Sequence, residues 1–248
     1  MKENRHKMLE KALCILELVA GEEDGLLFTD IVDRLEIPKS SAHSLLFTLE
    51  SMGYLEKKES TKKYRVGLKA FEIGSAFSER DGLYRYVKEI LKELVEEVGE
   101  TAHYATLDGV DVVYLNKYDC SHVVRMISHI GKRVPAHATA IGKAILAAKE
   151  NEEIIRLYQQ EELPVLTENT IKTRTKLIQC LERIRYTGFA LEKEESTPGI
   201  QCIAVGVKND KLQQNIAISI AVPISRAGDG MLRLKDPILR AKKKLESL

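Results

Sequence analysis

The sequence predicts an α+β protein in which an N-terminal winged helix–turn–helix domain precedes a larger domain built on an antiparallel sheet. Residues 28–65 fit two short helices, a tight turn and two short strands that would form the wing. Residues 83–98 carry apolar side chains at helical spacing, and from Thr101 the apolar pattern changes to period two. We therefore expect three parts: a winged domain over residues 1–78, a linker helix over 79–98 and a second domain over 99–248.

The composition is that of a soluble globular protein. Of the 248 residues, 44% are hydrophobic and 30% are charged. The net charge is +1, and residues 1–78 hold 12 Lys and Arg against 13 Asp and Glu, so affinity for nucleic acid would have to come from local placement of charge. The four cysteines form no CxxC pair, which fits a reducing cytoplasm. No apolar run approaches ~18 residues, so we expect neither a signal peptide nor a membrane span.

The first two helices form a support and the first half of the helix–turn–helix. Met8–Ala20 is amphipathic and ends at Gly21, so it is expected to pack behind the motif. Thr29 is the predicted cap of the next helix, and Asp30 in its first turn suits the helix dipole. Pro38 cannot continue an interior turn, so it ends that helix and opens the tight turn.

The second helix of the motif starts near Lys39 and ends at Gly53. Ala42, Leu45 and Leu49 fall on one buried stripe, which leaves a short, polar and nearly uncharged face on the other side. Such a face fits base edges in the major groove, where hydroxyls donate or accept hydrogen bonds. The residues predicted to face DNA from this helix are Lys39, Ser40, Ser41, His43, Ser44 and Thr48.

The wing is predicted from two short alternating strands, residues 54–56 and 64–66. Between and beside them, five cations stand against one acid, Glu59. A solvated hairpin has the same composition, but the order of helix, turn, helix and wing favours DNA binding. The cations predicted to contact phosphates are Lys57, Lys58, Lys62, Lys63 and Arg65.

The rest of the chain alternates helices with strands. Residues 68–78 form a short helix, and the stripe of residues 83–98 is expected to help to build a dimer together with apolar side chains of residues 1–20. Asp108-Gly109 marks a hairpin turn. The expected strands are 101–107, 112–115, 123–127, 189–191, 200–207 and 215–222, and the expected helices are 138–147, 151–160, 173–186 and 230–247.

No specific enzyme motif is present, so we expect no enzyme and no cofactor. The sequence lacks HExxH, a phosphate-binding loop and GxSxG. Cys202 could act as a nucleophile, but its strand-like surroundings favour a buried structural thiol. Four histidines could meet to bind a metal, although their spacing matches no ligand set and packed or solvated histidines are the simpler interpretation: His103, His122, His129 and His137.

Four blocks of sequence resemble a known family in their order and spacing. They read IPKSSAHSLLFTLESMGYL followed by the wing and YRVG, then VPAHATAIGKAILAA, FALEKEESTPGIQCIAVGV and AISIAVPISR. The chain resembles the IclR family of bacterial transcription regulators across essentially its whole length. The resemblance implies a C-terminal effector domain of GAF-like fold, and homodimers or homotetramers that bind double-stranded DNA at palindromic operators.

The resemblance also implies an effector pocket and marks departures from the family. Ser44 stands where the family often has arginine, which removes a phosphate or guanine contact. Some relatives have aspartate where Glu192 stands and serine where Ala221 stands, which changes the ligand that would fit. By block alignment, the lining is Val134, Ala140, Ile141, Glu192, Cys202, Ser219 and Ala221. The alternative is that these positions are core and bind no ligand.

The effector expected from these residues is a small carboxylic acid. A helix starting near Ala138 would offer free backbone donors to a carboxylate. Ser219 and Cys202 add donors, whereas Glu192 fits only a ligand hydroxyl or must itself be protonated. We therefore expect a hydroxy- or keto-acid, and a cytoplasmic, ligand-responsive transcriptional regulator that acts as a repressor. The alternative is an oligomeric DNA-binding regulator without a small-molecule effector.

Overall fold

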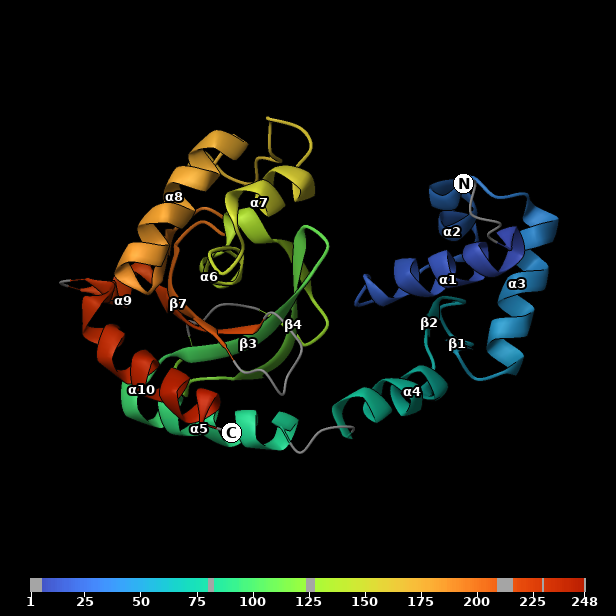
Figure 1. Cartoon of the computed structure of the whole chain (residues 1–248). Coiled ribbons are helices and arrows are strands. Elements are labelled where there is room, and N and C mark those ends of the chain that lie inside the picture. The colour runs from blue at the N-terminus through green and yellow to red at the C-terminus, as the bar shows by residue number, and fades with distance from the viewer. Residues whose placement is uncertain (1–5, 80–82, 124–127, 209–215, 229, 248) are drawn as a thin grey trace. The chain divides into compact units, whose positions relative to one another are not determined.

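The computed structural model describes residues 6–79, 83–123, 128–208, 216–228 and 230–247, and it divides the chain into two compact units. The first unit is Met1–Gly82 and the second is Leu83–Leu248 (Figure 1). Within the described ranges, no helix is both long and apolar enough to cross a membrane.

The first unit is the expected winged helix–turn–helix. Its elements are α1 (Lys7–Ala20), α2 (Phe28–Leu35), α3 (Lys39–Ser51), β1 (Leu55–Lys57), β2 (Tyr64–Val66) and α4 (Leu68–Glu79). Its core joins α1, α2 and α3 to the wing, because apolar side chains from these helices and from both strands are buried together. The central members are Ile15, Ile31, Leu46, Leu55 and Tyr64.

The start of α2 corrects the predicted cap. The helix begins at Phe28, one residue before Thr29, and the backbone N–H of Leu27 donates to Asp30 Oδ2 at 3.1 Å. Asp30 therefore caps the helix because its carboxylate reaches back to the residue before the first turn. The turn after α2 is made by Glu36 in the left-handed conformation, with φ of 50°, and Pro38 precedes α3 as expected.

The second unit is a six-stranded sheet in which every neighbouring pair is antiparallel. The strand order is β5-β4-β3-β8-β7-β6. The first and last thirds of the unit meet at the centre of the sheet, where β3 pairs with β8. The strands are β3 (Thr101–Asp108), β4 (Asp111–Tyr118), β5 (Arg133–Pro135), β6 (Ala190–Lys193), β7 (Ile200–Val207) and β8 (Ile216–Pro223).

Two strand predictions differ from the structure or fall outside it. The strand expected over 123–127 lies outside the described residues except for Val123, which is not in a strand. The loop expected before the central helix contains β5, because Arg133 and Val134 pair with the edge of β4. Pro135 ends this short edge strand, a position where a missing N–H costs little.

The helices of the second unit are shorter than predicted at several ends. The helix expected from Ala138 begins at Ala140, because Thr139 caps it and accepts a hydrogen bond from Gly142 N at 3.0 Å. The expected terminal helix 230–247 divides into a 3₁₀ turn, Met231–Leu234, and a helix from Lys235. The elements are α5 (Leu83–Val98), α6 (Ala140–Leu146), α7 (Asn151–Leu157), α8 (Arg174–Thr187), α9 (Ile224–Ala227) and α10 (Lys235–Glu246).

The two faces of the sheet carry different side chains. Helices α5 and α10 lie side by side on one face, and α6 covers the other (Figure 1). The α5 face is built from large aliphatic residues, including Ile203, Val205, Ile218, Ile220 and Val222. The α6 face is built from smaller and more polar residues: Thr101, His103, Ala105, Glu192, Cys202, Ala204, Ala217, Ser219 and Ala221.

The apolar stripe of α5 is covered within the same chain, which corrects the reason given for a dimer through this helix. Val87, Leu91 and Leu94 are buried among the large residues of the sheet and the apolar side of α10. Outside this stripe, Lys244 and Arg240 of α10 form ion pairs with acids of α5. The central part of the stripe, Val87 to Leu94, therefore stabilises the second unit and is covered within it.

Candidate functional site: the DNA-facing surface and a buried polar cluster

Helix α3 presents the polar face that the sequence predicts. Its buried stripe packs into the core, and the predicted DNA-facing residues are exposed except for Ser41, which is half-buried. Thr48 Oγ donates to the carbonyl oxygen of Ser44 at 2.9 Å, so this hydroxyl is held along the helix in the absence of DNA. Phe47 lies on the same side and is 67% exposed, so the described residues of the first unit leave its apolar ring largely uncovered.

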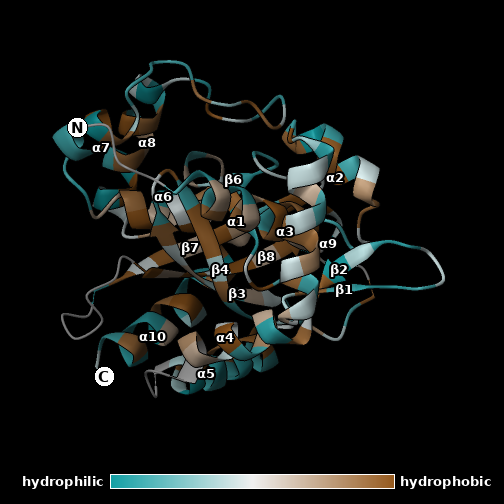
Figure 2. Ribbon diagram, turned by 90° about the vertical axis from the view of Figure 1, so that its right-hand side faces the viewer, coloured by the Kyte–Doolittle hydropathy of each residue, from teal (hydrophilic) through white to brown (hydrophobic). Residues whose placement is uncertain are grey.

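The wing carries fewer available charges than its composition indicates. Lys62 Nζ lies 2.5 Å from Glu59 Oε2, and Arg65 lies 3.9 Å from Asp24. These two cations are therefore partly neutralised by neighbouring acids. The loop between β1 and β2 is hydrophilic throughout (Figure 2).

Two other lysines of the wing, Lys58 and Lys63, form no ion pair within the described residues. Lys57 Nζ lies 5.2 Å from the ring centroid of Tyr64, a cation–π contact that leaves its charge uncompensated. The wing therefore offers three cations outside these ion pairs: Lys57, Lys58 and Lys63.

The predicted effector residues come together on the α6 face of the second unit. Ala140, Ile141, Cys202 and Ala221 belong to one buried cluster, and Val134 packs against it. In the sheet, Cys202 lies directly opposite both Glu192 and Ala221. Ser219 stands two residues along β8 from Ala221, so its side chain shares that face.

The buried carboxyl of Glu192 is only half satisfied. Its Oε1 accepts hydrogen bonds from the backbone N–H groups of Glu195, at 2.5 Å, and Ser196, at 3.2 Å. Its Oε2 is buried and has no hydrogen-bond partner within the described residues. Burial raises the pKa of Glu192, while the two backbone donors and the neighbouring thiol of Cys202 oppose that rise. An oxygen in this state would gain from any donor that entered the cluster.

A buried ion pair lies next to this carboxyl. Lys143 of α6 is 1% exposed, and its Nζ lies 2.6 Å from Glu195 Oε1. Thr170 Oγ donates to the backbone carbonyl oxygen of Glu195 at 2.6 Å, and so ties the segment before α8 to the β6–β7 loop. The cluster therefore holds two acids, Glu192 and Glu195, and one cation, Lys143.

Sequence reasoning missed four members of this cluster. His103 was considered as a metal ligand or as a packed or solvated histidine but not as part of this site, and Tyr114, Lys143 and Glu195 were not singled out. The period-two pattern could have assigned His103 to this face, because it is separated from Thr101 and Ala105 by one residue each. The pairing of Lys143 with Glu195 joins residues far apart in sequence, and no local pattern signals it.

The structure also corrects the expected carboxylate site at the start of α6. This helix has seven residues, and the N–H of Gly142 already donates to Thr139 Oγ. The helix start therefore carries fewer free donors than expected. Among the described residues, no group of three or more His, Cys, Asp or Glu side chains is placed to hold a metal ion.

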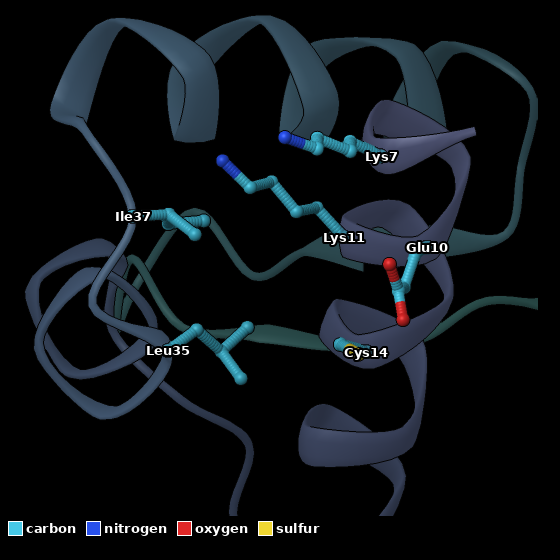
Figure 3. Close-up of a pocket in the computed structure, with 6 residues that line it drawn as sticks. All are labelled: Lys7, Glu10, Lys11, Cys14, Leu35 and Ile37. Carbon is cyan, nitrogen blue, oxygen red and sulfur yellow. The ribbon is translucent and has the colours of Figure 1, made fainter. Parts of the chain in front are cut away.

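A separate pocket of about 340 Å³ opens in the first unit, between α1 and the turn before α3. Lys7 and Lys11 extend into it from α1, and Leu35 and Ile37 line the opposite side (Figure 3). Its remaining lining residues are Glu10 and Cys14. This pocket contains none of the predicted effector residues.

Comparison with known proteins identifies both units. Residues 8–59 match the family model described as the IclR helix-turn-helix domain, and residues 76–244 match that of the bacterial transcriptional regulator IclR C-terminal. The HTH-type transcriptional regulator BhcR of Paracoccus denitrificans is 34% identical over 96% of this chain and 86% of its own length. The transcriptional repressor IclR of Escherichia coli is 31% identical over 89% of this chain and 81% of its own.

A solved structure shares the fold along almost the whole chain. It is an IclR homolog from Microbacterium hydrocarbonoxydans complexed with 4-hydroxybenzoate, with a TM-score of 0.83 and 21% identity over 97% of this chain and 98% of that one. The relatives compared are transcriptional regulators, which confirms that the chain is not an enzyme. Since family models match both units and the relatives align along most of its length, the chain belongs to the IclR family of bacterial transcriptional regulators.

Proposed function

We propose that this regulator is a repressor that binds a palindromic operator as a homodimer, or as a tetramer of two dimers, and responds to a small hydroxy acid. The observation that carries the proposal is the buried cluster around Glu192, whose Oε2 lacks a donor within the described residues. A purely structural core would gain stability by replacing such a group with an apolar one. The family repressor of Escherichia coli supports the repressor assignment.

In this proposal, α3 reads bases in the major groove and the wing binds phosphates. The base contacts come from the exposed side of α3, and the helix start adds a cation, Lys39. The residues assigned to DNA are Lys39, Ser40, Ser41, His43, Ser44, Thr48, Lys57, Lys58, Lys62, Lys63 and Arg65. DNA binding supports a cytoplasmic location for the protein.

The dimer is proposed to form through α4 rather than α5. Helix α4 leaves four large apolar side chains exposed, and Phe71 among them is 71% exposed. An apolar surface of this kind on a short helix needs a partner, and a second copy of the same helix offers a matching one. The other three are Leu68, Ile73 and Phe77.

The ligand is proposed to carry a carboxylate and a hydroxyl. The hydroxyl would donate to Glu192 Oε2, and the carboxylate would face the donors of the cluster. The fold neighbour complexed with 4-hydroxybenzoate supports this class, because that compound has both groups at opposite ends. The lining assigned to the effector is Val134, Ala140, Ile141, Glu192, Cys202, Ser219 and Ala221.

Two measurements on the full chain test the proposal. Selection from a random DNA pool should return an inverted repeat, because two copies related by a two-fold axis read two half-sites. Calorimetry with glycolate, lactate, pyruvate, gluconate and 4-hydroxybenzoate should find at least one that binds and changes operator affinity. A regulator that selects an inverted repeat but binds none of these acids would favour the alternative, a DNA-binding oligomer without a small-molecule effector.

A further inference from the structure

Tyr114 lies on the same face of the sheet as Glu192 but comes from a strand near the opposite edge. It lies on β4, directly opposite Ala105 of β3, and is 4% exposed. Its ring centroid lies 5.0 Å from that of His103. The next two strands present Ala217 and Gly206 in the same row, so the ring has small neighbours along the sheet.

The phenol of Tyr114 lies within electrostatic reach of the predicted effector residues. Tyr114 belongs to the same buried cluster as Cys202 and Ala221. Burial raises its pKa, and its interactions with Cys202 and Glu192 raise the pKa further. The hydroxyl therefore stays protonated at neutral pH and is available as a donor. Because Glu192 comes from β6 and Tyr114 from β4, the two groups approach the cluster from separate parts of the sheet.

The hydrogen-bonding character of the two groups is opposite. Burial raises the pKa of Glu192, and the two backbone N–H groups that donate to Oε1 oppose this rise; in its ionised form the carboxylate presents Oε2 as an acceptor. A bare carboxylate next to Oε2 would be repelled, whereas a hydroxyl would supply the missing donor. A phenol, by contrast, favours an acceptor such as a carboxylate oxygen.

We propose that Tyr114 is a specificity-determining residue of the effector site, where its hydroxyl donates to the carboxylate of the ligand while Glu192 accepts from a hydroxyl of the ligand. This inference rests on the proposed function, since it assigns the orientation of the acid in the same site. The site then selects a hydroxy acid over the analogue that lacks the hydroxyl, because the analogue leaves Oε2 without a donor.

Calorimetry of the full chain with two matched probe pairs tests this orientation. The pairs are lactate with propionate and gluconate with hexanoate, so each pair compares a hydroxy acid with its unhydroxylated analogue. In the wild type, the hydroxy acid of the pair that binds should be tighter by about ten- to a hundredfold. Tyr114→Phe removes one oxygen and keeps the ring, and should weaken both members of that pair by about tenfold, with their ratio unchanged.

Two further variants separate the roles. Glu192→Gln presents an amide N–H₂ where Oε2 accepts, so the preference for the hydroxy acid should fall while Tyr114→Phe preserves it. Tyr118→Phe is the matched control, because Tyr118 lies on the same strand but packs with the α5 face. It should leave both affinities and their ratio as in the wild type.

A tyrosine difference spectrum tests whether the phenol itself contacts the bound acid. The chain has nine tyrosines and no tryptophan, so a tyrosine difference spectrum is readable. The bound acid should perturb this spectrum in the wild type and in Tyr118→Phe, but not in Tyr114→Phe. If the wild type binds an acid and folded Tyr114→Phe binds it equally well, the inference fails alone. If the wild type binds none of the four acids but binds glycolate, pyruvate or 4-hydroxybenzoate, the inference also fails alone. If it binds none of these compounds, the inference fails together with the proposed acid effector.

Discussion

His103 of β3 lies directly opposite Ser219 of β8 in the antiparallel register, and both side chains are buried on the α6 face. His103 Nε2 lies 2.8 Å from Ser128 Oγ. Burial, with the positive charge of Lys117 second, lowers the pKa of His103 from 6.5 to about 4. The imidazole is therefore neutral at physiological pH and belongs to the polar cluster rather than to its surface.

This burial predicts a loss of stability in acid. Between pH 6.5 and about 4 the unfolded chain binds a proton at His103 that the folded chain does not, so stability falls as the pH is lowered through this window. The shift corresponds to about 3 kcal/mol at its limit. Calorimetric unfolding at pH 7, 6 and 5 should show that the stability of His103→Gln depends less on pH than that of the wild type.

Two other histidines account for the pH dependence of stability that remains in His103→Gln and supply a control variant. Burial also lowers the pKa of His137, so His103→Gln should reduce the acid sensitivity without abolishing it. His43→Gln on the exposed side of α3 should leave the dependence unchanged. An identical loss of stability in wild type and His103→Gln would contradict the assignment.

The wing predicts unequal roles for neighbouring lysines. Lys63→Ala should lower the salt slope of DNA binding by about one unit, because it removes one phosphate contact. Lys62→Ala should lower the slope by less, because Glu59 already offsets that charge at 2.5 Å. Fluorescence anisotropy across a salt series measures both. Equal slopes for the two variants would mean that the Lys62–Glu59 pair opens when DNA binds.

The exposed apolar side of α4 predicts the site of dimerisation. Phe71→Ser with Phe77→Ser should shift the chain toward monomer in sedimentation and weaken binding to an inverted repeat. Leu232→Ser is the matched control, because this side chain is 63% exposed in the second unit. A dimer that withstands the double substitution would place the interface elsewhere.

Two helical glycines predict opposite effects of the same substitution. A Cβ on Gly142 would lie 2.3 Å from the carbonyl oxygen of Ala136, so Gly142→Ala should destabilise the second unit by about 1–3 kcal/mol. A Cβ on Gly74 of α4 would meet nothing within 4 Å, so Gly74→Ala should be neutral or stabilising by up to about 1 kcal/mol. Thermal unfolding of both variants tests the contrast.

Local signals made the first unit predictable. Pro38 directly precedes α3, and the buried stripe of this helix is visible within thirteen residues. The fold of the second unit followed from alternation and from the family blocks. The cap of α2 was wrong because Thr29 and Asp30 are both good capping residues, and only the geometry of the chain entering the helix decides between them.

Contacts between residues far apart in the chain could not be predicted from the sequence. Strand β5 is too short to show alternation, and it exists because the edge of β4 pairs with it. The burial of the α5 stripe depends on α10, at the other end of the unit. The same holds for the cluster: Tyr114 of β4 and Glu192 of β6 come from strands with three others between them, and a linear pattern does not contain this strand order.

The two faces of the sheet differ in composition, so one face can stabilise the fold while the other forms the polar cluster. Large aliphatic residues such as Ile218 and Ile220 hold the sheet to α5 and α10, whereas alanines such as Ala204 and Ala221 face the polar cluster. Substitutions among the small residues would reshape the proposed ligand site while the other face keeps the unit folded. One scaffold can thus be retuned to new metabolites by a few exchanges on a single side, both in evolution and in the design of biosensors.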